Sequence, residues 1–311
     1  VFPTAFIPPV HVDFLGTRPA WPWKGILKPF KYFIKFKFHD PQVIESKPIS
    51  IISKESLTIP SLEAYLNISQ NYRSVTFADI SISNPAYSIN PEISDENGLT
   101  FDLGFRGNFR RKFSYDIGFF SLFYNGRIGF VQKAFKDGSV KSEKGNVGNA
   151  VMYGLESLID FDLNDIFIKN NDYSFNYFIN SSLINSEYTD SEVPGVKGNN
   201  VEFVPKINFK SGFKLGYKNL IFNIQYTFLS SQFTDASNAI DSNLSGLIGE
   251  IPSYQIIDLS ASYFFNKFKI ETGINNILDK HYFTRRATGY PGPGIIPSEP
   301  RSIYLTFQFK I

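Results

Sequence analysis

The 311-residue sequence contains no cysteine. This absence excludes a disulfide framework and any metal site with cysteine ligands. The three histidines, His11, His39 and His281, are scattered along the chain and lack the spacing of metal ligands. We therefore expect no resident metal ion or other cofactor.

Long apolar runs and charged residues are also scarce. No run approaches the roughly 18–20 apolar residues that a membrane-spanning helix needs, which excludes a helical membrane protein. Charged residues make up 19% of the chain, and the net charge is +2. This balance gives no indication of nucleic-acid binding, and we expect no nucleic-acid partner.

Catalytic patterns are missing as well. The sequence has no glycine-rich phosphate loop and no spacing of Ser, His and Asp that singles itself out. Asp160 and Asp162 form a close pair of carboxylates, but they end a predicted strand and are explained more simply as the flank of a turn. We predict that the protein is not an enzyme; a barrel lipase or protease is the alternative.

Aromatic residues are abundant, with 33 Phe and 17 Tyr. At the C-terminus, apolar residues at Ile303, Leu305, Phe307 and Phe309 alternate with polar ones, which is the period of a strand with two different faces. A transmembrane strand needs only about 9–11 residues, half of them apolar. A secreted β-sandwich alternates in the same way and is the other fold compatible with the composition.

The spacing of the strands favours a transmembrane antiparallel β-barrel. Predicted strands cover 61–71, 97–107, 112–124, 149–162, 172–186, 203–217, 219–231, 254–265, 267–277 and 300–311. Long connections at 72–96, 125–148, 187–202, 232–253 and 278–299 alternate with short ones at 108–111, 163–171, Lys218 and Asn266. Outer-membrane barrels have short periplasmic turns and long extracellular loops, an asymmetry that sandwiches lack.

Residues 1–60 differ from the rest and are predicted to be an atypical N-terminal segment with room for one or two strands. The first 25 residues contain five prolines and both tryptophans, and proline interrupts the hydrogen bonds of a sheet. Phe and Lys then alternate from Lys28 to His39, as in a strand. A basic, aromatic membrane-surface or nucleic-acid patch is the alternative here.

Three segments contain recognisable motifs: Gly-Ile-Asn-Asn-Ile-Leu-Asp-Lys-His-Tyr-Phe from Gly273, Ser-Ser-Gln-Phe-Thr-Asp from Ser230 and Glu-Ile-Pro-Ser-Tyr from Glu250. The first resembles a motif shared broadly by TonB-dependent outer-membrane receptors. The other two resemble narrower motifs of their ferric-dicitrate (FecA-like) branch. Similar segments begin at Asn67, Gly198 and Pro300, so the resemblance covers 61–311 in the order of the family.

The resemblance implies that 61–311 is the C-terminal part of a receptor barrel, about ten strands of a barrel of the 22-strand type. It implies uptake of an iron(III) chelate, ferric dicitrate or a related siderophore, across the bacterial outer membrane, with iron present only in the cargo. It also implies contact with outer-membrane lipid. The expected energy source is the TonB–ExbB–ExbD system, acting through a plug domain that this chain is expected to lack.

Alternatives remain at this point. The cargo could be a haem, a vitamin or a glycan, or the chain could be a non-transporting truncated barrel or a small porin. Ten strands with two unpaired edges are not expected to be stable in a bilayer without a closing partner.

Electrostatics and the resemblance together predict a ligand site in the long loops. Basic residues outnumber acidic ones in 125–148 and in 280–301, and the guanidinium group of arginine matches carboxylates. The predicted ligand-binding residues are Arg73, Arg127, Gln132, Arg285 and Arg286. Gln132 takes this role from the resemblance alone, whereas the last loop lacks the asparagine that the family has there. The simpler interpretation is that these side chains contact solvent or lipopolysaccharide, and that Arg73 pairs with Asp79.

Overall fold

The computed structural model describes residues 49–52, 61–81, 87–109, 112–168, 170, 172–244, 246–287 and 294–310. All of them fall in one compact unit, Ile44–Ile311. The predicted atypical segment 1–60 lies outside the described residues except for 49–52, which form strand β1 (Ile49–Ile52).

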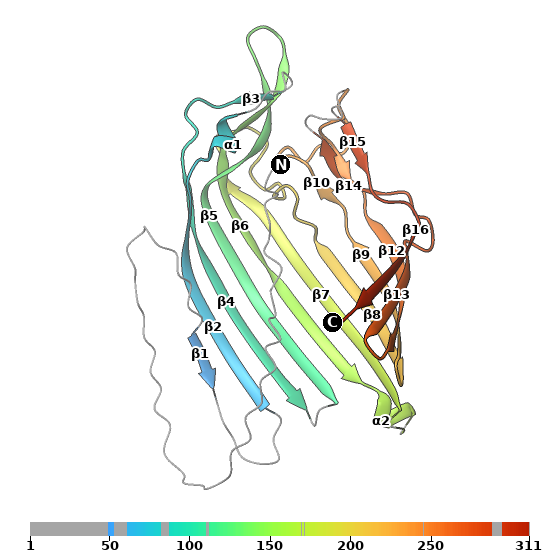
Figure 1. The fold of residues 1–311 in the computed structure, drawn as a ribbon. Helices are drawn as coiled ribbons and strands as arrows, with labels where there is room; N and C mark the ends of the chain where they lie inside the picture. Colours follow the sequence, from blue (N-terminus) through green and yellow to red (C-terminus); the bar gives the residue numbers. More distant parts are fainter. Residues whose placement is uncertain are drawn as a thin grey trace, which may run out of the picture. The chain divides into compact units, whose positions relative to one another are not determined.

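All ten predicted strands are present. They are β2 (Ser61–Arg73), β4 (Glu96–Phe109), β5 (Phe113–Ala134), β6 (Val140–Asp162), β7 (Tyr173–Asp190), β8 (Ile207–Tyr217), β9 (Leu220–Leu229), β12 (Tyr254–Phe265), β13 (Phe268–Asn275) and β16 (Ser302–Phe309). Each pairs antiparallel with the next one, in the order in which they occur in the chain (Figure 1). The predicted all-β, antiparallel barrel fold is therefore confirmed. Within the described residues, no helix is long and apolar enough to cross a membrane.

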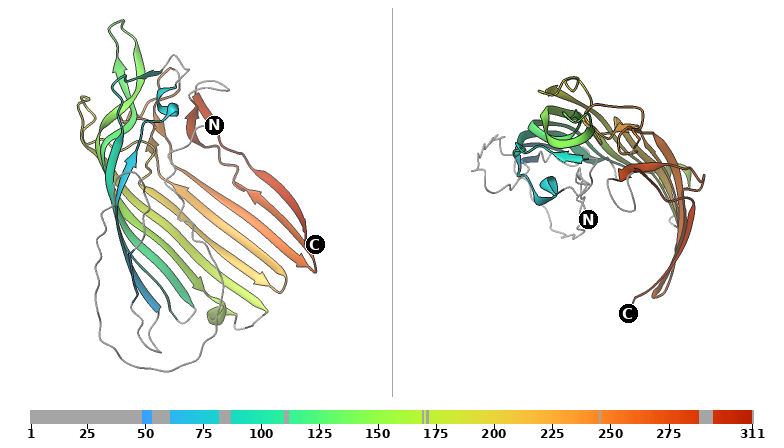
Figure 2. Two further views of the ribbon diagram at one scale, coloured as in Figure 1. Left: turned by 60° about the vertical axis from the view of Figure 1, so that its left-hand side comes forward. Right: turned by 90° about the horizontal axis from the view of Figure 1, so that it is seen from above.

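The sheet is curved and open. β1 and β16 form its two edges and do not pair with one another in the described part of the chain (Figure 2). This arrangement is that of a partial barrel, as predicted.

The two ends of the sheet differ as predicted. At one end, the turn end, strands are joined by short connections such as 218–219 and 266–267, and the short helix α2 (Asn164–Phe167) joins β6 to β7. Lys218 and Asn266 begin the two-residue turns with φ of 50° and 52°, and a positive φ in such a turn matches the twist of the flanking strands.

The other end, the loop end, carries the remaining elements. They are α1 (Phe77–Ile80), β3 (Tyr87–Ile89), β10 (Gln232–Phe233), β11 (Glu250–Ile251), β14 (Phe283–Ala287) and β15 (Gly294–Pro297). β10 pairs with β11, β14 pairs with β15, and β3 pairs parallel with β6.

The prediction of a long loop at 125–148 is wrong. Segment 125–148 is not an irregular loop, because β5 and β6 continue through it as a paired hairpin, here called the β5–β6 extension. The register shifts on both sides of Arg127, and Gly126 there has φ of 60°. Such bulges shift the alternation of side chains between faces, which hid the continuing strands from the sequence pattern.

The faces of the sheet agree with the predicted alternation. Phe213 pairs with Ile224 and Leu215 with Phe222 on the apolar face, whereas Lys214 pairs with Asn223 on the polar face. Towards the turn end, aromatic rings of the apolar face contact one another with centroid distances of 4.6–6.2 Å. This turn-end aromatic belt consists of Phe113, Tyr115, Phe161, Tyr173, Phe175, Tyr177, Phe213 and Tyr217. Such belts mark the level of the lipid headgroups in membrane barrels.

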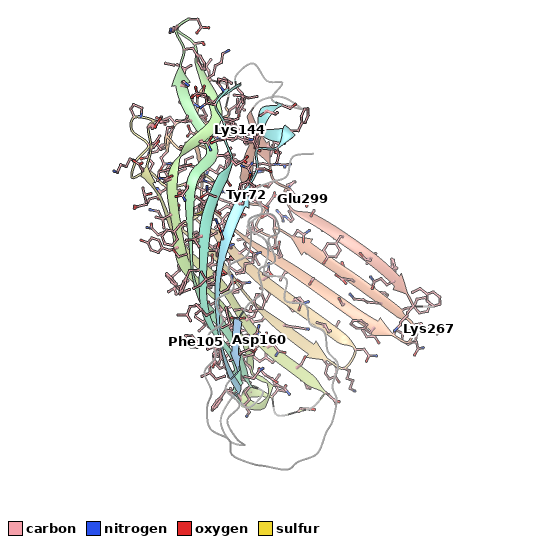
Figure 3. All side chains as sticks on the ribbon, turned by 90° about the vertical axis from the view of Figure 1, so that its left-hand side faces the viewer. Tyr72, Phe105, Lys144, Asp160, Lys267 and Glu299 are labelled. Atoms are coloured by element: carbon pink, nitrogen blue, oxygen red, sulfur yellow. The ribbon has the colours of Figure 1, made fainter. Side chains whose placement is uncertain are left out.

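Side chains cover the sheet from one end to the other (Figure 3). Lys144 lies near the loop end, Phe105 and Asp160 lie towards the turn end, and Lys267 lies at a turn. The candidate site at the loop end and the turn-end aromatic belt therefore lie at opposite ends of the sheet.

Glycines of the polar face accommodate aromatic rings from neighbouring strands. A Cβ atom on Gly104 would lie 2.1 Å from Cζ of Tyr65, and one on Gly273 would lie 2.5 Å from Cε1 of Tyr304. The Tyr65 hydroxyl in turn donates a hydrogen bond of 3.0 Å to Asp116. An aromatic ring over a glycine restores the packing that the glycine itself cannot provide.

We predict that Gly104→Ala destabilises the full-length protein by about 1–3 kcal/mol, because the new methyl group displaces the Tyr65 ring. The denaturant midpoint, followed by the mobility shift of unheated protein in gels, measures the change. A double-mutant cycle is the control: in a Tyr65→Ala background the same substitution should cost much less. Equal costs in the two backgrounds would contradict this packing role.

Candidate functional site

The described residues form a buried hydrophobic core at the loop end, under the β5–β6 extension. Its members come from β5, β6, the end of β7 and the connections that follow β7 and β10: Val131, Val147, Ala150, Met152, Tyr188, Val196, Val201, Val204 and Ala236. Tyr188 is fully buried among them. This core fixes the positions of the charged groups around it.

Arg127 lies in a buried charged cluster on this core. Its Nη2 atom is 3.4 Å from Oε1 of Glu202, and its guanidinium group lies 5.5 Å from the centre of the Tyr124 ring. Tyr188 donates a 2.7 Å hydrogen bond to the other oxygen of Glu202. Gly129 makes room for this carboxylate, because a Cβ atom there would lie 2.5 Å from Oε1 of Glu202.

The neighbouring charges determine the protonation of Arg127 and Tyr188. Burial is the largest single effect on Arg127 and would lower its pKa, but Glu202, Tyr188, Glu96 and Tyr124 together outweigh it and the pKa is raised. Burial raises the pKa of Tyr188, and Glu202 raises it further. Arg127 therefore stays charged and Tyr188 stays neutral. A buried pair of this kind is strongly destabilised when one partner is removed.

A second cluster connects Arg73 to the β5–β6 extension. Arg73 contacts Asp79 at 2.7 Å and Glu96 at 3.6 Å. Lys144 contacts the same Asp79 oxygen at 2.7 Å. Burial would raise the pKa of Asp79, but the hydrogen bonds from Lys144 and Thr76 hold it well below its usual value. The predicted simple pairing of Arg73 with Asp79 is thus present.

Glu96 links the two clusters. Besides its contact with Arg73, its Oε2 atom accepts a 2.7 Å hydrogen bond from the backbone of Ile128, the residue after Arg127. The negative charge of Glu96 also helps to raise the pKa of Arg127.

A small cavity of about 40 Å³ lies where the loop-end segments meet. It is lined by Tyr87, Phe130, Ser142, Phe203, Thr234, Asp235, Leu247, Ile248 and Arg286. Burial raises the pKa of Asp235; hydrogen bonds from Ser237 oppose this effect, the charge of Glu202 adds to it, and Gln132 lowers the pKa slightly. The volume suits a few water molecules and is too small for an iron chelate.

Arg286 forms one wall of this cavity and holds a neighbouring loop. Its guanidinium group donates to the backbone carbonyls of Gly246 at 2.9 Å and Glu250 at 3.0 Å, and to Ser242 Oγ at 3.3 Å. Its Nε atom is buried without a hydrogen-bond partner. Burial lowers the pKa of Arg286. The preceding residue, Arg285, is exposed.

The structure therefore places the five predicted residues in different surroundings. Arg73 and Arg127 are linked through Glu96, and Gln132 and Arg286 both lie near Asp235. Arg285 stands apart on the surface. Sequence reasoning missed Tyr188, Glu202 and Asp235; the only signal for the two acids was that their connections are net acidic beside a basic segment. Among the described residues no group of three or more His, Asp or Glu is arranged to hold a metal ion.

We predict that Asp235→Asn stabilises the loop end by about 1 kcal/mol at neutral pH, since it removes a buried charge that forms no ion pair within the described residues. Folding raises the pKa of Asp235, so its cost applies above the folded-state pKa and fades on acidification. The gain should vanish below the ordinary value of 3.8, where the carboxyl group is protonated in both states.

Hydrogen–deuterium exchange of segment 230–253, measured at several pH values, tests this prediction. Asp172→Asn, at the exposed turn end, is the control and should change nothing in that segment. Faster exchange in Asp235→Asn at neutral pH, or a gain that does not depend on pH, would contradict the assignment.

Comparison with known proteins identifies the fold. Residues 56–277 match the family described as "TonB dependent receptor-like, beta-barrel". The unliganded ferric citrate transporter FecA is similar with a TM-score of 0.64 and 21% identity, over 84% of this chain and 37% of that chain. The copper transporter OprC gives 0.61 and 14%, over 81% of this chain and 37% of that chain.

A third similar structure is the ferric yersiniabactin uptake receptor FyuA from Yersinia pestis, with a TM-score of 0.58 and 17% identity over 84% of this chain and 36% of that chain. The chain thus spans little more than a third of the length of these three proteins, and identities this low show a shared fold only. The family match itself covers well over half of the chain and agrees with the antiparallel sheet described above. The chain belongs to the β-barrel family of TonB-dependent receptors.

Proposed function

We propose that this chain is the C-terminal part of the barrel of an outer-membrane receptor that takes up an iron(III) chelate, ferric dicitrate or a related siderophore. Two of the structural relatives carry ferric chelates in their names, a ferric citrate transporter and a ferric yersiniabactin receptor. Segments that resemble motifs of the ferric-dicitrate branch support this choice. In the whole protein, a plug pulled by TonB would supply the energy-coupled step.

The observation that carries the proposal is the state of the two adjacent arginines of β14. Arg285 is exposed, and no carboxylate of the described residues lies within ion-pair distance of either guanidinium group. In contrast, Lys133 and Lys144 of the β5–β6 extension pair with Glu143 and Asp79. β14 therefore carries two adjacent positive charges that no described carboxylate compensates, and this pair would attract an anionic chelate. Lys136 and Lys141, near the tip of the β5–β6 extension, also form no ion pair within the described residues.

Neighbouring residues of a strand point in opposite directions, so the two arginines have different roles. Arg285 is available to a ligand arriving from solution. Arg286 donates to three groups of loop 242–250 and would contribute mainly by keeping that loop in place. Arg127 and the amide nitrogen of Gln132 are buried, so a chelate would reach them only after the loops move.

Another cargo is the alternative, because the copper transporter shares the fold almost as closely as the ferric citrate transporter does. Fold similarity does not distinguish between these cargoes. We favour the iron chelate because of the positive charge of β14, and a measurement of ferric dicitrate binding tests this preference.

We expect the full-length protein to bind ferric dicitrate with micromolar or tighter affinity, and Arg285→Ala to weaken binding about tenfold, or about 1.4 kcal/mol. Arg286→Ala should weaken binding as well and should also speed hydrogen exchange in 242–250, because it removes the contacts that hold this loop. Isothermal titration measures the first effect, and exchange mass spectrometry measures the second.

Lys267→Ala is the matched control, since it removes a positive charge at the turn end. Its affinity should equal that of the unsubstituted protein. If the unsubstituted protein does not bind ferric dicitrate, this cargo is wrong and only the receptor family remains. If Arg285→Ala binds normally, the site lies elsewhere.

A further inference from the structure

The second notable hollow of the described residues lies far from the candidate site, at the turn end of β7, β8 and β9. It is a groove of about 270 Å³. It is lined by Ile168, Tyr173, Ser174, Leu215, Gly216, Tyr217, Leu220 and Phe222. None of these described lining residues is charged, and the lining is almost entirely apolar.

The groove opens on the apolar face of the sheet. Leu215 pairs with Phe222, Tyr217 with Leu220, and Tyr173 with Tyr217, so these side chains project from the same face. Tyr173 and Tyr217 also belong to the turn-end aromatic belt, with ring centroids 4.6 Å apart. The groove therefore lies at the level of the lipid headgroups and extends into the hydrocarbon.

The turn that contains α2 helps to shape the groove. Ile168, the residue after α2, adds an apolar wall, and its backbone is held by a 2.9 Å hydrogen bond to the carbonyl of Asn164. The hollow thus results from the packing of the strands and of the α2 turn.

A cation lies beside the groove. Lys218 follows Tyr217 directly, its Nζ atom is 5.3 Å from the centre of the Tyr217 ring, and its backbone is fixed by a 2.8 Å hydrogen bond to the carbonyl of Asp172. Lys218 is exposed and forms no ion pair with a carboxylate of the described residues. A lysine at this level attracts the phosphate groups of lipids.

We propose that this groove binds one phospholipid of the periplasmic leaflet, with an acyl chain against Leu215, Leu220 and Phe222 and its phosphate at Lys218. An apolar groove with Lys218 at its rim matches an amphiphile that carries a phosphate, and the position in the aromatic belt matches the depth of such a molecule. The inference rests on the membrane location within the proposed function and does not depend on the cargo.

Native mass spectrometry of the full-length protein in mild detergent, titrated with palmitoyl-oleoyl phosphatidylglycerol, tests the inference. We expect one lipid to be retained more tightly than the rest. Leu215→Trp, which fills the groove, should weaken this binding more than tenfold. Lys218→Gln should weaken it about fivefold, the effect of one lysine near a lipid surface. A diacylglycerol, which has no phosphate, should bind to the unsubstituted protein about as weakly as the phospholipid binds to Lys218→Gln.

Two matched variants separate this site from general lipid contact. Leu155→Trp changes another exposed leucine of the apolar face, and Lys267→Gln removes a lysine from another turn. Neither should affect the tight lipid. The inference is overturned if no lipid is retained preferentially, or if the control variants lose it as readily as Leu215→Trp and Lys218→Gln.

Ferric dicitrate binding, measured on the same samples, keeps the two proposals apart. If the unsubstituted protein retains no lipid preferentially but binds the chelate, only the lipid site is refuted. Lipid retention without chelate binding refutes only the cargo.

Discussion

The structure depends on one constraint: within hydrocarbon, every backbone N–H and C=O group needs a partner supplied by the protein itself. The long antiparallel ladder from β2 to β16 meets this constraint for all the strands inside it. The same constraint forces side chains into two alternating sets, one that faces lipid and one that faces the interior. It also explains why the irregular segments lie at the two ends of the sheet, and why ion pairs within the ladder, such as Glu63–Arg106 and Lys269–Glu271, lie on its polar face.

At the loop end, the physical problem changes from pairing backbone groups to compensating charges. The segments there are held by acids that each satisfy more than one partner: Asp79 receives Arg73 and Lys144, and Glu202 receives Arg127 and Tyr188. Three of the basic residues of the β5–β6 extension, Arg127, Lys133 and Lys144, are neutralised by carboxylates in this part of the structure. Charge counted along the sequence therefore overstates the charge that a ligand would meet.

The sequence predicts the regular strands of the sheet well and the charged contacts of the loop end poorly. Where the period of two is uninterrupted, as in β8, β9 and β16, residue type alone indicates the strand and its faces. The β5–β6 extension escaped prediction because bulges beside Arg127 interrupt that period. The pairing of Arg73 with Asp79, six positions apart, was predicted, whereas the more distant acids of the site escaped prediction for a different reason. Glu202 lies 75 positions from Arg127, and Asp235 lies more than a hundred positions from Tyr87 in the same cavity, so only the folded sheet brings them together.

The short strand β3 pairs along β6, so that Tyr87–Ile89 is a third strand on the β5–β6 extension. The connection after β2 and the extension therefore share backbone hydrogen bonds as well as the contact between Asp79 and Lys144. We therefore expect these two segments to change together in evolution. A receptor of this kind that acquires a new cargo by exchanging or lengthening one segment has to alter the other with it, and diversity in this part of the family is expected to arise by paired changes.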